Sequence, residues 1–287
     1  ITAGNGMWRN LSNYLPLQGF DKLIDENMIK REYPEAEKYA DTWGVPDEFV
    51  FKYAQKLLKE STKPQMIYVL TVTNHSPFRP PESYKPNVVK VSKRLEEMLG
   101  SMSDQSEALL QTYQYANDAL GNFIEGIKHS NLEDKTIIAA TGDHRVRYLD
   151  TNKKEEFGLT DAVPFYLYVP EVILENTDYL FDAQRIGSHR DLFPTLYHFS
   201  LSDSDYITLG GENLLSPQPV ANFGYNAARV ITPLGATGGS SKDKLYPWTS
   251  DGLHSLPNAI QNPKPNAASD YRQLQDMYLR SQVMGKI

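Results

Sequence analysis

Two adjacent side chains near the middle of the chain, Asp143 and His144, have the chemistry of metal ligands. They follow the apolar run 135–141 through Gly142, so a turn can direct a carboxylate oxygen and an imidazole nitrogen toward one point. Such a pair suits a divalent cation of the zinc or manganese kind. The simpler alternative is an aspartate that caps the next turn beside a hydrogen-bonded surface histidine. Because the chain has no cysteine, any metal site must use oxygen and imidazole ligands.

A second set of residues could hold an anionic ester of phosphate or sulfate. His75 follows the apolar run 66–73, so its imidazole would stand at a strand end. A hydrogen-bonded loop histidine is the alternative. An arginine fork suits an anionic ester and an indole can cover a sugar or glycerol, so Arg9 and Trp8 form a candidate clamp, unless Trp8 is a buried structural residue. His189 precedes an apolar helix, and its expected roles are packing and capping.

Alternating helices and strands must position these residues. Continuous apolar runs predict buried strands over 66–73, 135–141 and 163–170. Apolar residues near a 3.6-residue period predict helices over 46–61, 92–132, 187–200 and 270–284. This order predicts an α/β fold, with helices on both faces of a parallel or mixed sheet. Since reacting groups in such sheets lie at the carboxyl ends of strands, His75 and the Asp143-His144 pair are expected to share one cleft.

The last part of the chain has a different composition. Residues 217–265 are rich in glycine, proline, asparagine and serine, with strand candidates at 221–225 and 228–232 and a flexible loop at 235–241. A small strand-and-loop region is therefore expected after residue 215.

Composition excludes several classes of protein. The 287 residues are 40% hydrophobic and 23% charged, which is typical of a globular chain with a full core. The net charge is −7 and no run of five like charges occurs, which argues against a nucleic-acid partner or a polybasic membrane surface. No apolar stretch approaches the ~18 residues of a membrane span. The chain starts at Ile1 in a loop-like segment, and we expect it to be a piece of a longer protein.

Several short motifs occur in a characteristic order. They are Gly4-Asn5 through Trp8-Arg9, Trp43-Gly44-Val45-Pro46-Asp47, the stretch 115–121, Gly142-Asp143-His144, Asp191-Leu192-Phe193-Pro194 and Gly211-Glu212-Asn213-Leu214. Together they resemble the alkaline phosphatase/sulfatase superfamily, and within it the lipoteichoic acid synthase and membrane phosphoglycerol transferase group. The chain departs from that group after the Asp-His pair, where Arg145-Val146-Arg147-Tyr148 replaces the usual small residue.

The resemblance implies an alkaline-phosphatase-like α/β fold with a mostly parallel sheet. Residues 1–215 would be a partial catalytic domain, and 216–287 a C-terminal strand, loop and helix region of the same domain. Asp143 and His144 would bind a divalent ion (Mn²⁺, Zn²⁺ or Mg²⁺), while Trp8, Arg9 and His75 would bind the substrate. The attacking serine or threonine of the family would fall before Ile1, so no catalytic nucleophile is assigned within the chain. With two ligands only, the ion is expected to bind poorly and the chain alone to be inactive.

The implied activity is metal-dependent transfer of a phosphoglycerol-type head group from a membrane lipid to a glycan or polymer acceptor, through a covalent enzyme ester. It would take place on the extracytoplasmic face of a bacterial membrane, with the membrane reached through segments before Ile1. Two alternatives stay open: a sulfatase or phosphodiesterase that releases its product to water, and an inactive module that binds an anion or a glycan.

Overall fold

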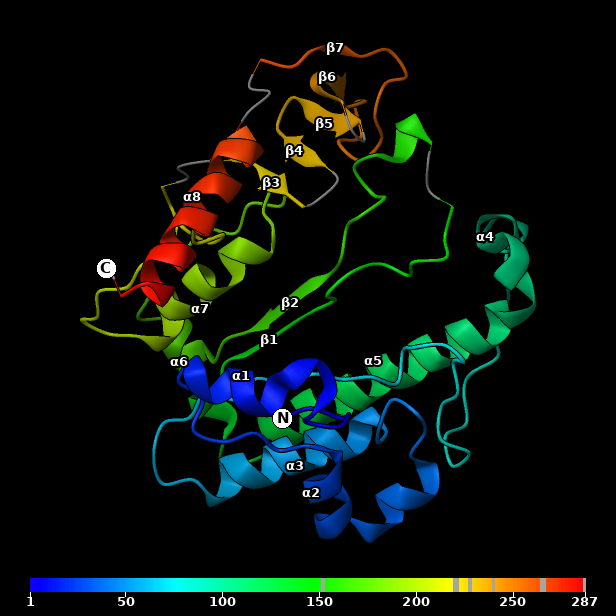
Figure 1. Ribbon diagram of the computed structural model, residues 1–287, viewed down its shortest axis with the longest axis vertical. Coiled ribbons are helices and arrows are strands. Elements are labelled where there is room, and N and C mark those ends of the chain that lie inside the picture. The colour runs from blue at the N-terminus through cyan, green and yellow to red at the C-terminus, as the bar shows by residue number, and fades with distance from the viewer. Residues whose placement is uncertain (151–152, 219–221, 227–228, 239–240, 264–266, 286–287) are drawn as a thin grey trace. The chain divides into compact units, whose positions relative to one another are not determined.

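The computed structural model describes residues 1–150, 153–218, 222–226, 229–238, 241–263 and 267–285 (Figure 1). The chain forms two compact units, Ile1–Thr136 and Ile137–Ile287. The functional division after residue 215 stays a prediction. Among the described residues, no helix is both long and apolar enough to cross a membrane.

Helices make up the regular structure of the first unit. They are α1 (Leu11–Leu17), α2 (Glu26–Glu32), α3 (Asp47–Glu60), α4 (Lys93–Leu99) and α5 (Ser106–Lys128), with 3-10 turns η1 (Trp8–Asn10), η2 (Pro34–Tyr39), η3 (Gly100–Gln105) and η4 (Glu133–Lys135). The helix expected over 46–61 is present as α3, whose first turn carries two acidic residues that favour a helix start. The helix expected over 92–132 is interrupted at Gly100, whose backbone (φ 55°, ψ −115°) cannot continue an α-helix.

The core of the first unit lies against α3. Helix α3 runs along α5 (Figure 1), and Phe51 stacks on Phe123 with ring centroids 5.2 Å apart. The buried cluster on the other side of α3 joins residues from the loops as well as the helices: Ala3, Ile24, Ile29, Ala36, Val45, Phe49, Val50 and Tyr53. Ala3 and Val45 therefore anchor the loops that carry Trp8 and Trp43 to the core.

The run 66–73 is extended but is not the fully buried strand that its sequence predicts. It pairs in parallel with the first residues of the chain, since Leu70 N donates to Ile1 O (2.9 Å) and Ala3 N donates to Leu70 O (3.0 Å). Met66 and Tyr68 are exposed, whereas Val69 packs against the core. The side chains of the run are therefore only partly covered within this unit, and its backbone pairs there over a short segment.

The strands of the described residues lie in the second unit. Strands β1 (Ile138–Thr141) and β2 (Phe165–Tyr168) pair antiparallel, with Ile138 opposite Tyr168. A second sheet has the order β3 (Gly224–Tyr225), β4 (Val230–Thr232), β5 (Gly235–Gly238), β6 (Ser241–Pro247) and β7 (Ile260–Gln261). The remaining elements are η5 (Lys154–Glu156), α6 (Glu171–Leu174), η6 (His189–Asp191), α7 (Leu192–Ser200) and α8 (Ala267–Val283).

Two sequence-based expectations differ from the observed sheets. The described ladders are antiparallel rather than mostly parallel, because each described pair joins strands that are consecutive along the chain, with no crossover α-helix between them. The prediction of a flexible loop at 235–241 is wrong for residues 235–238, which form β5, and for residue 241, where β6 begins; residues 239–240 lie outside the described residues. Gly235 has φ 153°, and a Cβ there would collide with the backbone of Tyr246, so glycine permits this close strand pairing. The candidates at 221–225 and 228–232 correspond to β3 and β4; residues 221 and 228 lie outside the described residues.

Candidate active site

Trp8 and Arg9 lie in an exposed, tightly turned loop of the first unit. Arg9 (φ 51°) and Asn10 (φ 61°) both have left-handed backbones, which non-glycine residues rarely adopt. Gly6 holds the turn, because its N–H donates to Asp25 (3.3 Å) and its carbonyl accepts from the Ser12 hydroxyl (2.7 Å).

The side chains of this loop are open to solvent. The Arg9 guanidinium lies 5.4 Å from the centroid of the Trp8 ring. Trp8 is 53% exposed, so the buried structural alternative does not apply. A guanidinium beside an exposed indole can bind an anion next to a small apolar group.

His75 stands at the end of the run 66–73, as the sequence predicts, in a turn that begins at Val72. Its Nδ1 lies 2.8 Å from Val72 O. A carbonyl oxygen only accepts, so Nδ1 carries the hydrogen. Nε2 is thus the ring nitrogen through which His75 can act on a ligand, and no partner for it is seen among the described residues.

The segment 43–47 surrounds this turn. The Trp43 and His75 rings are stacked, with centroids 4.2 Å apart and planes 23° apart. Asp47 is buried, and its Oδ1 accepts hydrogen bonds from the backbone N–H of Val72 (3.0 Å) and Thr73 (3.1 Å). Burial raises the pKa of the Asp47 carboxyl, and these hydrogen bonds oppose part of that rise.

Asp143 and His144 follow β1 through Gly142, at the strand end where the sequence places them. Asp143 Oδ2 and His144 Nε2 are 3.4 Å apart. Two zinc ligands at about 2.0–2.2 Å in tetrahedral geometry are separated by about 3.3–3.6 Å, so these two atoms fit one cation. His144 Nδ1 lies 2.7 Å from Arg145 O and therefore carries the hydrogen, which leaves Nε2 as the acceptor.

Arg147 bonds to the same nitrogen. Its Nη2 lies 3.1 Å from His144 Nε2, so the guanidinium takes the lone pair that a metal ion would use. Within the described ranges, no three His, Asp or Glu side chains are close enough to hold a metal together. Asp143 and His144 thus fit as two ligands of a set whose other members are not assigned in this chain.

His189 supports the same strand end. Its Nε2 lies 2.8 Å from the carbonyl of Gly142, directly before the Asp-His pair. Thr141 Oγ1 donates to Pro164 O at 2.9 Å and ties this end of β1 to the residue before β2. The sequence suggested packing and capping for His189. The contact with Gly142 additionally places it beside the proposed metal ligands.

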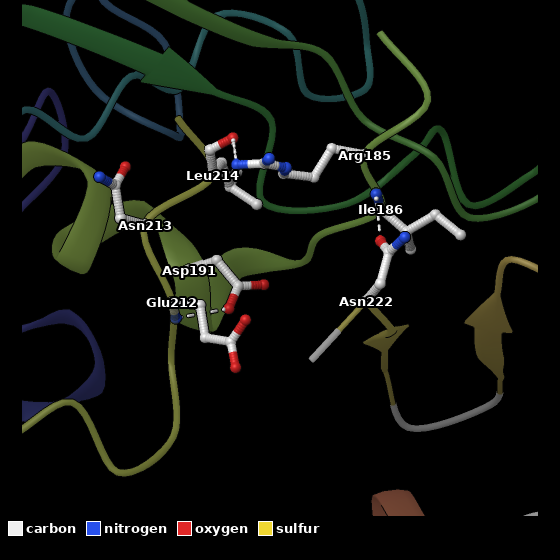
Figure 2. A pocket seen from close by; sticks show the side chains of 7 residues that line it. All are labelled: Arg185, Ile186, Asp191, Glu212, Asn213, Leu214 and Asn222. Carbon is white, nitrogen blue, oxygen red and sulfur yellow. Dashed lines mark hydrogen bonds between the residues drawn. The ribbon is translucent and has the colours of Figure 1, made fainter. Parts of the chain in front are cut away.

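A small pocket in the second unit brings two of the sequence motifs together (Figure 2). Buried Asp191 accepts from the backbone N–H of Glu212 (3.0 Å) and of Ser188 (2.8 Å). Arg185 donates to Leu214 O at 2.9 Å. These hydrogen bonds between side chains and the backbone hold the 185–191 and 211–215 segments together.

The structure places the sequence-predicted residues in two groups. Trp8, Arg9 and His75 lie in the first unit, and Asp143 and His144 in the second. Their convergence on one cleft stays a prediction. Sequence analysis assigned no role to Trp43, although it begins the Trp43-Gly44-Val45-Pro46-Asp47 motif.

Comparison with known proteins supports the resemblance. The profile of the sulfatase family matches residues 1–199. Among curated relatives, the lipoteichoic acid synthase-like protein YvgJ of Bacillus subtilis is 26% identical over 69% of this chain and 31% of its own length. The lipoteichoic acid synthase of Staphylococcus saprophyticus is 24% identical over 69% of this chain and 29% of its own length. The chain spans about a third of the length of these relatives.

A solved structure gives the fold. A protein in the alkaline phosphatase superfamily from Vibrio parahaemolyticus superimposes with a TM-score of 0.67 at 18% identity, over 96% of this chain and 65% of that one. This similarity confirms the alkaline-phosphatase-like α/β fold. Because the sulfatase profile matches more than half of the sequence, the chain belongs to the sulfatase family.

Proposed function

We propose that this chain is part of an enzyme that transfers a phosphoglycerol-type head group from a membrane lipid to a glycan or polymer acceptor. The observation that carries the proposal is the 3.4 Å separation of Asp143 Oδ2 and His144 Nε2, which suits two ligands of one divalent ion. The names of the relatives, lipoteichoic acid synthases, support the substrate class. By the same analogy, the reaction takes place on the extracytoplasmic face of a bacterial membrane.

Each candidate residue has a role that follows from its chemistry. The Arg9 guanidinium donates to phosphate oxygens, and the Trp8 ring covers the glycerol. His75 donates to a phosphate oxygen through Nε2 when that nitrogen is protonated. Asp143 and His144 hold the divalent ion. When bound, the ion supplies positive charge that stabilises phosphoryl oxygens and the ionised form of an attacking hydroxyl.

The attacking group is proposed to be a serine or threonine hydroxyl outside residues 1–287. It would displace the lipid alcohol from phosphorus and form a phosphoester with the enzyme, and an acceptor hydroxyl would then displace the enzyme oxygen. The lipid alcohol leaves with one proton, and the acceptor gives up one. Water in place of the acceptor would give the phosphodiesterase alternative, and a sulfate ester the sulfatase alternative.

One observation favours a second candidate, a binding module without catalysis. The Arg9 guanidinium lies 5.4 Å from the centroid of the exposed Trp8 ring, and this pair can bind an anion or a glycan without a metal ion.

Incubation with phosphatidylglycerol and Mn²⁺ tests the proposal. The complete product of the gene and this 287-residue chain are assayed in parallel for release of diacylglycerol, with labelled glycerol phosphate followed into acceptor or water. We expect metal-dependent release by the complete protein and none by Asp143→Ala. Release that persists in Asp143→Ala would contradict the metal assignment. No turnover of any phosphate or sulfate ester by the complete protein, with glycerol phosphate still bound, would favour the binding module.

A further inference from the structure

We infer that Trp43 is a positioning residue for His75, an inference that deepens the proposed function because it concerns the proposed head-group site. The stacked rings, 4.2 Å between centroids, belong to residues 32 positions apart and join two loops of the first unit. The contact gives a role to the Trp43-Gly44-Val45-Pro46-Asp47 motif, which neither the metal ligands nor the head-group clamp explains.

Trp43 is itself held in a defined orientation. Its indole Nε1 donates to Ser76 O at 2.7 Å, and its backbone N–H donates to Asp41 Oδ1 at 2.7 Å. The next residue, Gly44, has φ 141° and lies so close to Ala3 that a Cβ would collide with the Ala3 backbone. The indole plane is therefore fixed at its ring nitrogen and at its backbone.

The stack restricts rotation of the His75 imidazole, which would move Nε2 away from a bound ligand. The hydrogen bond from Nδ1 to Val72 O fixes one edge of the imidazole, and the Trp43 ring covers one face. Rotation of the imidazole would break both contacts, so Nε2 is kept in one place. Asp47 also fixes this segment, because its carboxylate accepts hydrogen bonds from the N–H groups of Val72 and Thr73 in the turn that leads to His75.

Core packing does not account for this pair. Trp43 is 38% exposed, His75 is only partly buried, and neither belongs to the buried cluster of the first unit. A stacked aromatic pair is worth about 0.5–1.5 kcal/mol, which corresponds to about two- to tenfold in an equilibrium constant. Loss of the stack should thus weaken the binding of a ligand to His75 without unfolding the protein.

The test compares Trp43→Leu, which removes the stack, with Trp43→Phe, which keeps an aromatic ring but loses the indole donor. Trp248→Phe is the matched control, since Trp248 Nε1 also donates to a backbone carbonyl, Thr232 O at 2.8 Å, in the second unit. Two readouts are recorded on the 287-residue chain: hydrogen exchange of the His75 Nδ1–H by NMR of histidine-labelled protein, and affinity for sn-glycerol 3-phosphate.

We expect faster Nδ1–H exchange and about two- to tenfold weaker binding in Trp43→Leu, a smaller effect in Trp43→Phe and none in Trp248→Phe. In a His75→Gln background, Trp43→Leu should cause no further loss of affinity, because Trp43 acts through His75. An equal loss in that background, or unchanged exchange and affinity in Trp43→Leu, would overturn the inference. If the wild-type chain binds no glycerol phosphate, the proposed ligand fails, and the exchange rate alone decides: acceleration in Trp43→Leu supports the positioning role and an unchanged rate refutes it.

Discussion

Replacement of the buried Asp47 carboxylate is the sharpest test of how the first unit holds its part of the site. Asp47 is 1% exposed and accepts hydrogen bonds from the backbone N–H groups of Val72 and Thr73. In Asp47→Ala both N–H groups lose their partner, at a cost of about 1–2 kcal/mol each for partly buried groups. Removal of a buried charge returns some of this energy, so we expect a net loss of about 2–3 kcal/mol in the free energy of unfolding.

The pH dependence isolates the charge of this residue. Asp47→Asn keeps a carbonyl oxygen that can accept both bonds but has no charge. Because burial raises the pKa of the Asp47 carboxyl above 3.8 in the folded state, the folded protein binds the proton more tightly than the unfolded chain. The stabilisation that this proton provides is complete below the ordinary pKa and is lost as the pH rises through the raised pKa. Relative to Asp47→Asn, the wild type should therefore lose stability as the pH rises above 3.8 and through the raised pKa of Asp47.

Urea denaturation at several pH values measures both effects. Ser92→Ala is the control, since Ser92 is an exposed helix cap whose hydroxyl accepts from the backbone N–H of Leu95 at the start of α4 (3.2 Å). It should cost about 1 kcal/mol, as an ordinary helix cap does. If Asp47→Ala costs no more than Ser92→Ala, or if the wild type gains stability over Asp47→Asn as the pH rises, the assigned role of burial is refuted.

Further substitutions test the proposed site. Arg147→Gln should increase the affinity for Mn²⁺, because the guanidinium competes for His144 Nε2; unchanged affinity, measured by electron paramagnetic resonance of free Mn²⁺, would contradict this. Asp143→Ala or His144→Ala should abolish metal-dependent turnover by the complete protein, and activity comparable to wild type would remove them from the site. Arg9→Ala should lower kcat/KM on a phosphoglycerol lipid, through a loss of about 2–4 kcal/mol of transition-state stabilisation, with the metal affinity unchanged. Equal kcat/KM would exclude Arg9 as a clamp.

Helices were the most predictable part of the fold. The apolar period and acidic start of α3 are local features, and the structure places the helix within one residue of the predicted range. Strand pairing was less predictable, because it depends on partners far along the chain. The Gly-Ala-Thr-Gly segment of β5 has the composition of a loop and becomes a strand only through its pairing with β6. The run 66–73 shows the converse: strong strand composition, but only a short parallel partner within its own unit.

In the candidate site, too, features set by local sequence were predictable and contacts set by the tertiary structure were not. The position of Asp143 and His144 at a strand end follows from local sequence, because an apolar run ending in glycine marks where the strand stops. The bond from Arg147 to His144 depends on the shape of the following turn, which no periodicity encodes. The stack of Trp43 on His75 joins loops distant in sequence, so it was visible only as a motif without a role.

The two arginines that depart from the family pattern after the Asp-His pair have different physical situations. Arg145 is built into the fold: its Nη1 donates to the carbonyls of Val146 and Leu149, both at 2.9 Å, and its Nε faces Asp161 at 3.5 Å. Asp161 also pairs with the buried Arg229 of the β3–β7 region, so Arg145 connects the loop to that sheet. Arg147 is exposed, and the side-chain bond seen for it is to His144. An exposed guanidinium gives up one hydrogen bond at little cost, whereas displacement of Arg145 would break three contacts. The departure from the family pattern is therefore compatible with a metal ion at His144: Arg145 shapes the loop, and Arg147 is the group that a divalent ion would displace.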